Sequence, residues 1–238
     1  VNKVNFTFKS NASDIDVYAV KWIPEGDIKA VVQICHGLND YIERYDGFAR
    51  FLAENGVLVV GHDLLGHGFT AKQPDDYGYF ADWAGNGKLV SDIFKLKVII
   101  KKDYPDLPYF ILGHSFGSLL AREYIVRFKD DIDGVILMGT MNYSDFELHI
   151  ARALAKITAL LRGKRYRSDL LYGIAVHGFN KRYENEVHNA WLTRDLDIVR
   201  QFNKDKLCSF IITVGAFIDM FDGLLEVNDS DNIGTINK

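Results

Sequence analysis

The sequence predicts an α/β fold in which a mostly parallel sheet is covered by helices on both faces. Three observations point to it. Two short β-branched apolar runs without a polar face, at residues 30–35 and 57–61, are typical of central parallel strands. Apolar residues at helical spacing lie between these runs. Strands and helices then alternate along the chain, and this repetition predicts a parallel sheet with crossover helices.

The first half of the chain supplies most of the predicted sheet. Residues 4–9 and 16–22 alternate in polarity and predict two antiparallel strands joined by a polar turn. One helix ends at Asn55-Gly56, and a longer one is closed by Tyr104-Pro105. Residues 109–112 follow as the next buried strand, so strand–helix–strand units account for this half.

The pattern changes beyond the strand predicted at residues 134–138. Residues 146–161 form a strongly apolar helical pattern, and short helices and loops are expected over 168–205. Residues 209–225 are again apolar and predict a helix, although 211–214 also fit a strand. We therefore divide the chain into a core, a helical cap and a return segment, at residues 1–143, 144–207 and 208–238.

Composition narrows the class of protein. The chain has 238 residues, 48% of them hydrophobic, which suits one medium globular domain with an insertion. A net charge of −4 argues against nucleic acid as a partner. Cys35 and Cys208 lie in apolar surroundings and are expected to be buried, reduced thiols. Without a signal-peptide pattern or an apolar run long enough to span a bilayer, we expect a cytoplasmic protein. Nothing calls for a cofactor, and the oligomeric state is left open.

The pentapeptide Gly113-His114-Ser115-Phe116-Gly117 carries the chemistry. It follows a predicted strand and precedes a helix expected from Ser118 to about Phe128, the context of a nucleophile elbow. A serine at such a sharp turn adopts a strained backbone, and small flanking residues let neighbouring segments approach. The hydroxyl then lies at a helix N-terminus, where the amide of Phe116 stabilises a developing oxyanion. The alternative is a chance pentapeptide in a tight turn.

A second amide donor is expected after the strand at residues 30–35. The turn His36-Gly37-Leu38 would direct the amide of Leu38 into the same site. The alternative is an ordinary turn that ends the strand at Gly37.

The loop His62-Asp63-Leu64-Leu65-Gly66-His67-Gly68 invites a metal interpretation. Its two histidines lack a common metal-binding spacing, and no third ligand is evident, so we predict no metal. We expect a glycine-rich loop that braces the site, with Asp63 accepting hydrogen bonds from backbone amides. His177 and His188 are interpreted as surface or packing histidines.

Together the motifs around His36, Asp63 and Ser115 resemble the monoglyceride lipase/lysophospholipase branch of the α/β-hydrolases, sometimes grouped with serine aminopeptidases. The match covers roughly residues 15–145, and Thr70 stands where that branch often has serine. The resemblance implies hydrolysis of the carboxylic ester of a small acyl lipid, and it leaves ester versus amide, acyl length and head group open. It implies Ser115 as nucleophile and the amides of Leu38 and Phe116 as the oxyanion hole. It also implies supporting roles for His36, Gly37, Asp63, His67 and His114.

The partners of Ser115 are missing from the expected places. In this fold an acidic residue and then a histidine follow the serine along the chain. The seven histidines lie at positions 36, 62, 67, 114, 149, 177 and 188, and none is near the end. We therefore expect a chain that stops before its last strands, which would leave an open sheet edge and little activity. Two alternatives are a non-catalytic binding protein and recruitment of His149 or His188 as the base.

Overall fold

The computed structural model describes residues 1–11, 14–180, 183 and 187–236. Its centre is a six-stranded sheet with the strand order β1-β2-β4-β3-β5-β6. The strands are β1 (Asn2–Lys9), β2 (Asp16–Ile23), β3 (Ala30–Cys35), β4 (Val57–His62), β5 (Tyr109–His114) and β6 (Gly134–Met138). β1 and β2 pair antiparallel, as predicted, and β3 to β6 are parallel. The predicted mostly parallel sheet is confirmed.

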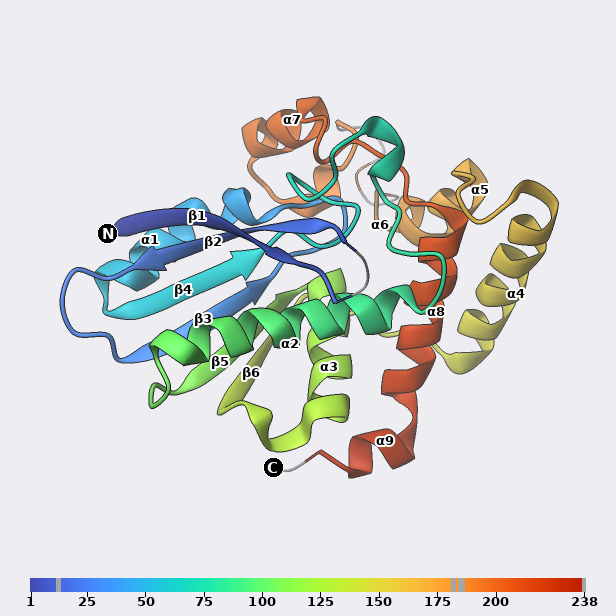
Figure 1. Ribbon diagram of the computed structural model, residues 1–238. Helices are drawn as coiled ribbons and strands as arrows, with labels where there is room; N and C mark the ends of the chain where they lie inside the picture. Colours follow the sequence, from blue (N-terminus) through green and yellow to red (C-terminus); the bar gives the residue numbers. More distant parts are fainter. Residues whose placement is uncertain (12–13, 181–182, 184–186, 237–238) are drawn as a thin grey trace.

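Helices cover both faces of this sheet (Figure 1). The longer ones are α1 (Asp46–Glu54), α2 (Gly85–Asp103), α3 (Phe116–Phe128), α4 (Asp145–Arg162), α7 (Leu196–Lys204) and α8 (Val214–Asn228). The shorter ones are η1 (Ile42–Tyr45), η2 (Pro74–Asp76), η3 (Lys129–Asp131), α5 (Asp169–Tyr172), η4 (Gly173–His177), α6 (Gly178–Asn180), η6 (Ala190–Leu192) and α9 (Ser230–Gly234). α1 lies on one face, and α2, α3 and α8 lie on the other (Figure 1).

The two faces bury separate cores because consecutive strand residues point to opposite sides. Leu58 and Val60 of β4 join the large core under α2, α3 and α8. Val59 between them joins the smaller core under α1, together with Ile42 and Ala53. Strands buried on both faces lack a polar side, which is why the apolar runs in the sequence identified them.

α4 and α8 pack against one another and form one side of the molecule (Figure 1). α4 begins at a capping box, in which Ser144 and Glu147 satisfy each other's backbone amides, and it ends at Gly163. α8 begins only at Val214, because the hydroxyl of Thr213 accepts a hydrogen bond from the amide of Ala216. The helix predicted from residue 209 was therefore wrong over its first five residues. Thr213 instead forms an isolated β-bridge with Arg167.

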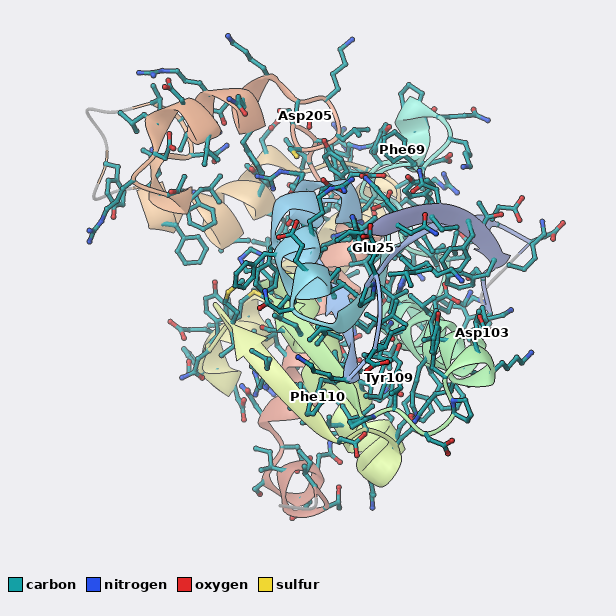
Figure 2. All side chains as sticks on the ribbon, turned by 90° about the vertical axis from the view of Figure 1, so that its left-hand side faces the viewer. Glu25, Phe69, Asp103, Tyr109, Phe110 and Asp205 are labelled. Atoms are coloured by element: carbon teal, nitrogen blue, oxygen red, sulfur yellow. The ribbon has the colours of Figure 1, made fainter. Side chains whose placement is uncertain are left out.

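β6 forms one edge of the sheet, and its outer side is open in the described part of the chain. Ile136, Leu137 and Met138 are 50%, 39% and 47% exposed, although all three are large and apolar. Figure 2 shows the molecule from the side. Tyr109 and Phe110, at the start of the neighbouring β5, are labelled in its lower half, and Asp205, which follows α7, is labelled near the top. An open strand edge with exposed apolar side chains is an aggregation hazard.

Cys35 and Cys208 are both buried and free, as predicted. Among the residues that the structure describes, no helix has both the length and the apolar character to cross a bilayer.

Candidate active site

Ser115 occupies a sharp turn between β5 and α3. Its backbone has φ +52° and ψ −117°, a conformation that a residue with a side chain rarely adopts. The turn is fixed from two sides. The amide of Ser115 donates to the carbonyl of Met138 in β6 at 2.8 Å, and its carbonyl accepts from the amide of Ser118 at 2.8 Å. That second bond already belongs to the first helical turn, so α3 begins at Phe116, two residues earlier than predicted.

The two glycines of the pentapeptide are required by close approach. A Cβ on Gly117 would lie 2.1 Å from the carbonyl oxygen of Cys35, and one on Gly113 would lie 2.4 Å from the carbonyl oxygen of Gly117. Both distances are far below a normal contact, so α3 packs directly on β5 and on the end of β3 only because side chains are absent here.

The loop after β3 lies against the serine. A Cβ on Gly37 would lie 3.4 Å from Cβ of Ser115 and 3.3 Å from Nδ1 of His114. The structure therefore brings the predicted Gly37-Leu38 segment to the Ser115 turn. The assignment of the Leu38 and Phe116 amides as the oxyanion hole stays a prediction.

His36 is fully buried and connects two loops. The amide of Leu64 donates to Nε2 of His36 at 3.0 Å, so the proton lies on Nδ1, which donates to the carbonyl of Gly37 at 2.8 Å. Burial lowers the pKa of His36 to about 4, so the ring is neutral at neutral pH. The ring of His67 lies beside it in a tilted arrangement, 5.3 Å between ring centroids, and burial lowers the pKa of His67 to about 3.

Asp63 anchors the glycine-rich loop. Its two carboxyl oxygens each accept a backbone amide at 2.7 Å, one from Ile42 and one from Phe69. Burial raises the pKa of Asp63 to about 7, although both amide bonds favour the charged form. Gly68 adopts a positive φ of +46°, and a Cβ there would lie 2.2 Å from this carboxylate. The loop thus closes tightly around Asp63. No group of three or more potential metal ligands occurs among the residues described.

Ser115 lines a cavity of about 650 Å³. Gly37, Leu38 and His114 line the same end of it. Most of the remaining wall is apolar and comes from α4, from the segment between α4 and α8, and from α8, including Leu148, Ile150, Ala151, Leu154, Ile174, Phe179, Trp191, Met220 and Phe221. Such a shape suits a ligand with a long apolar part and a polar group at the Ser115 end.

His114 is the one histidine among the described residues that line this cavity. His149 and His188, named above as alternative bases, are both exposed and are not part of its wall. The side chain of His177 lies outside what the structure describes. Recruitment of His149 or His188 as the base therefore finds no support in the geometry.

Sequence reasoning missed a polar group on the cavity wall. The hydroxyl of Tyr45 lies 2.9 Å from Oδ2 of Asp40 and 3.0 Å from Nδ1 of His114. Arg44 donates to Oδ1 of Asp40 at 2.7 Å. The only signal in the sequence was an Asp-x-x-x-Arg-Tyr spacing after the His36 loop, which indicates no chemistry by itself.

A mostly parallel sheet covered by helices, with a serine on a strained strand-to-helix turn, defines the fold as that of an α/β-hydrolase. The family model described as serine aminopeptidase, S33, matches residues 26–234. The chain therefore belongs to this family, and the resemblance inferred from its motifs is confirmed.

The chain is similar to monoglyceride lipases. It is 33% identical to the mouse monoglyceride lipase over 134 residues, which are 55% of this chain and 41% of that protein. It is 30% identical to the monoacylglycerol lipase of Mycolicibacterium smegmatis over 146 residues, 61% of this chain and 50% of that one. The crystal structure of a carboxyl esterase from Bacillus coagulans superposes with a TM-score of 0.84 at 27% identity, covering 94% of this chain and 73% of that one. The matches thus span half the length of these two lipases or less.

Proposed function

We propose that this chain forms the nucleophile-bearing part of a serine hydrolase that cleaves carboxylic esters of monoacylglycerol or lysophospholipid type. The observation that carries the proposal is Ser115. The residue adopts a strained turn and lies on the wall of a largely apolar cavity, beside the Gly37-Leu38 loop. The similarity to monoglyceride lipases supports the substrate class.

In the proposed reaction, Oγ of Ser115 attacks the carbonyl carbon of the ester. The negative charge that develops on the carbonyl oxygen is stabilised by the amides of Leu38 and Phe116 and by the N-terminus of α3. The alcohol leaves with a proton, and the acyl group remains on Ser115 as an ester that water then hydrolyses. The apolar wall formed by α4 and α8 would contact the acyl chain.

We further propose that the 238-residue chain alone turns esters over poorly. A serine hydroxyl is a weak nucleophile until a base removes its proton, and loss of the base removes on the order of 10⁶ in turnover. His36 is unsuited to this role because both of its ring nitrogens already have partners. We propose that the residues described supply neither the acid nor the base.

Labelling with a fluorophosphonate and turnover of a p-nitrophenyl ester test both parts. We expect weak turnover and slow labelling, both abolished in Ser115→Ala but unchanged in Ser91→Ala, whose hydroxyl donates to the carbonyl of Gly87 within α2. Labelling at another residue, or none at all despite a folded chain, would refute Ser115 as nucleophile and favour a non-catalytic binding protein. Rapid turnover that depends on Ser115 would instead refute the proposal that this chain alone lacks the base.

A further inference from the structure

Asp40, Tyr45 and His114 form a polar cluster that connects the two segments meeting at the candidate site. Asp40 lies two residues beyond Leu38, and His114 immediately precedes Ser115. Tyr45 lies between them, 2.9 Å from Asp40 and 3.0 Å from His114. A single phenol therefore connects the loop that carries the Leu38 amide with the turn that carries Ser115.

The protons along this connection are determined by elimination. An ionised carboxylate only accepts hydrogen bonds, and Asp40 already accepts from Arg44 and from the amide of Tyr41. The one proton of the Tyr45 hydroxyl must therefore point to Asp40. The hydrogen bond between Tyr45 and His114 then needs a proton on Nδ1 of His114, which leaves Nε2 of the neutral ring without a proton.

Tyr45 itself is firmly placed. It ends η1, and the first residue of η1, Ile42, donates its amide to Asp63 at 2.7 Å. The side chain of Ile42 is fully buried, and a Cβ on Gly61 would lie only 2.2 Å from it. Because η1 cannot shift without disturbing β4, the Tyr45 hydroxyl is a fixed point against which the loop and the turn are held.

We propose that Tyr45 is a positioning residue, which keeps the Leu38 loop and the Ser115 turn at a fixed separation through Asp40 and His114 and fixes His114 as the Nδ1–H tautomer. The catalytic consequence rests on the proposed function, because an oxyanion hole needs both of its amides about 2.7–3.1 Å from one oxygen atom. Preorganised donors of this kind must be held within about 0.5 Å. The tautomer does not depend on catalysis.

The tautomer is measured by two-bond ¹H–¹⁵N spectra of the full chain with ¹⁵N-labelled histidine at neutral pH. The His114 signals are assigned by their loss in His114→Gln. We expect the Nδ1–H form in the parent chain and a mixture of both tautomers in Tyr45→Phe, which lacks only the hydroxyl. Tyr18→Phe is the matched control, since it removes a phenol that donates to Glu43 of the same η1 at 2.6 Å but leaves the Tyr45 hydroxyl in place, and its His114 signals should equal those of the parent.

The rate of phosphonylation at Ser115 provides the second measurement. We expect Tyr45→Phe to lower it about tenfold, since small misplacements at a reacting centre carry large rate costs. The urea unfolding midpoint of Tyr45→Phe should equal that of Tyr18→Phe, since each variant loses one phenol hydroxyl. An Nε2–H tautomer in the parent, or an unchanged Nδ1–H signal in Tyr45→Phe, would overturn the inference. So would an undiminished labelling rate. If Ser115 is never labelled, the proposed function fails, while the tautomer spectra still decide the role of Tyr45.

Discussion

Gly117→Ala is the substitution for which the structure gives the sharpest expectation. The added methyl group would lie 2.1 Å from the carbonyl oxygen of Cys35 and 2.6 Å from that of His36. Both are backbone atoms, so no side-chain rotation relieves the clash. The end of β3 and the N-terminus of α3 would have to separate by roughly 1 Å to restore an ordinary contact.

Two consequences follow from that separation. Overpacking of this kind costs about 1–3 kcal/mol in the free energy of unfolding, which for a chain of this size lowers Tm by roughly 3–10 °C. The same shift moves the loop after β3 away from Ser115, and a displacement of about 1 Å at a reacting centre costs on the order of 10²-fold in rate. The loss of Ser115 reactivity should therefore exceed what the loss of stability explains.

Urea unfolding and fluorophosphonate labelling, both at a temperature where every variant is folded, measure the two effects. Gly47→Ala is the matched control, because Gly47 lies in α1 with nothing within 4 Å of an added Cβ. It should gain about 0.5–1 kcal/mol from helix propensity and label normally. A Gly117→Ala chain as stable and as reactive as its parent would show that α3 and β3 do not approach as described.

Three further predictions address strain, pH and the sheet edge. Ser115→Gly should abolish labelling yet raise the free energy of unfolding by about 1 kcal/mol, because glycine adopts a positive φ without the strain that serine carries; a lower urea midpoint would contradict it. Burial lowers the pKa of His62 from 6.5 to about 4. As the pH falls from 6.5 towards 4, the unfolded chain therefore binds a proton at His62 before the folded chain does, and the free energy of unfolding decreases. His62→Leu should therefore flatten the dependence of unfolding free energy on pH by up to ~1.4 kcal/mol per pH unit, whereas an unchanged slope in urea titrations would argue against a neutral buried ring. Ile136→Lys should slow concentration-dependent aggregation, followed by light scattering, with less than about 0.5 kcal/mol change in stability; equal scattering would mean that β6 is not the exposed edge.

The central strands and the Ser115 turn were predictable because their signals are local. Apart from Gln33 and His62, β3 and β4 carry no polar side chain on either face, a composition typical of strands covered on both sides. The Gly-x-Ser-x-Gly spacing predicted the turn because the two glycines and the serine meet within five residues, whatever the rest of the chain does.

The start of α8 could not be found in the same way. Residues 211–214 are β-branched and, apart from Thr213, apolar, so they fit a strand as well as a helix. A tertiary contact decided between them, since Thr213 bonds through its amide and hydroxyl to the carbonyl of Gly78 in a distant loop. A pattern within one segment carries no information about such a partner.

The Tyr45 connection shows the same limit at the candidate site, since Tyr45 and His114 are 69 positions apart. It also shows why the strained turn persists. A backbone conformation that costs about 1–3 kcal/mol survives only where its surroundings leave no alternative. At Ser115 those surroundings include the carbonyl of Met138, which accepts the Ser115 amide from β6, the open edge of the sheet. Fraying of that edge would release the amide of Ser115. The reactivity of the serine is therefore expected to depend on how well β6 is covered, and a strand or partner that pairs with this edge would stabilise the turn as well as the sheet.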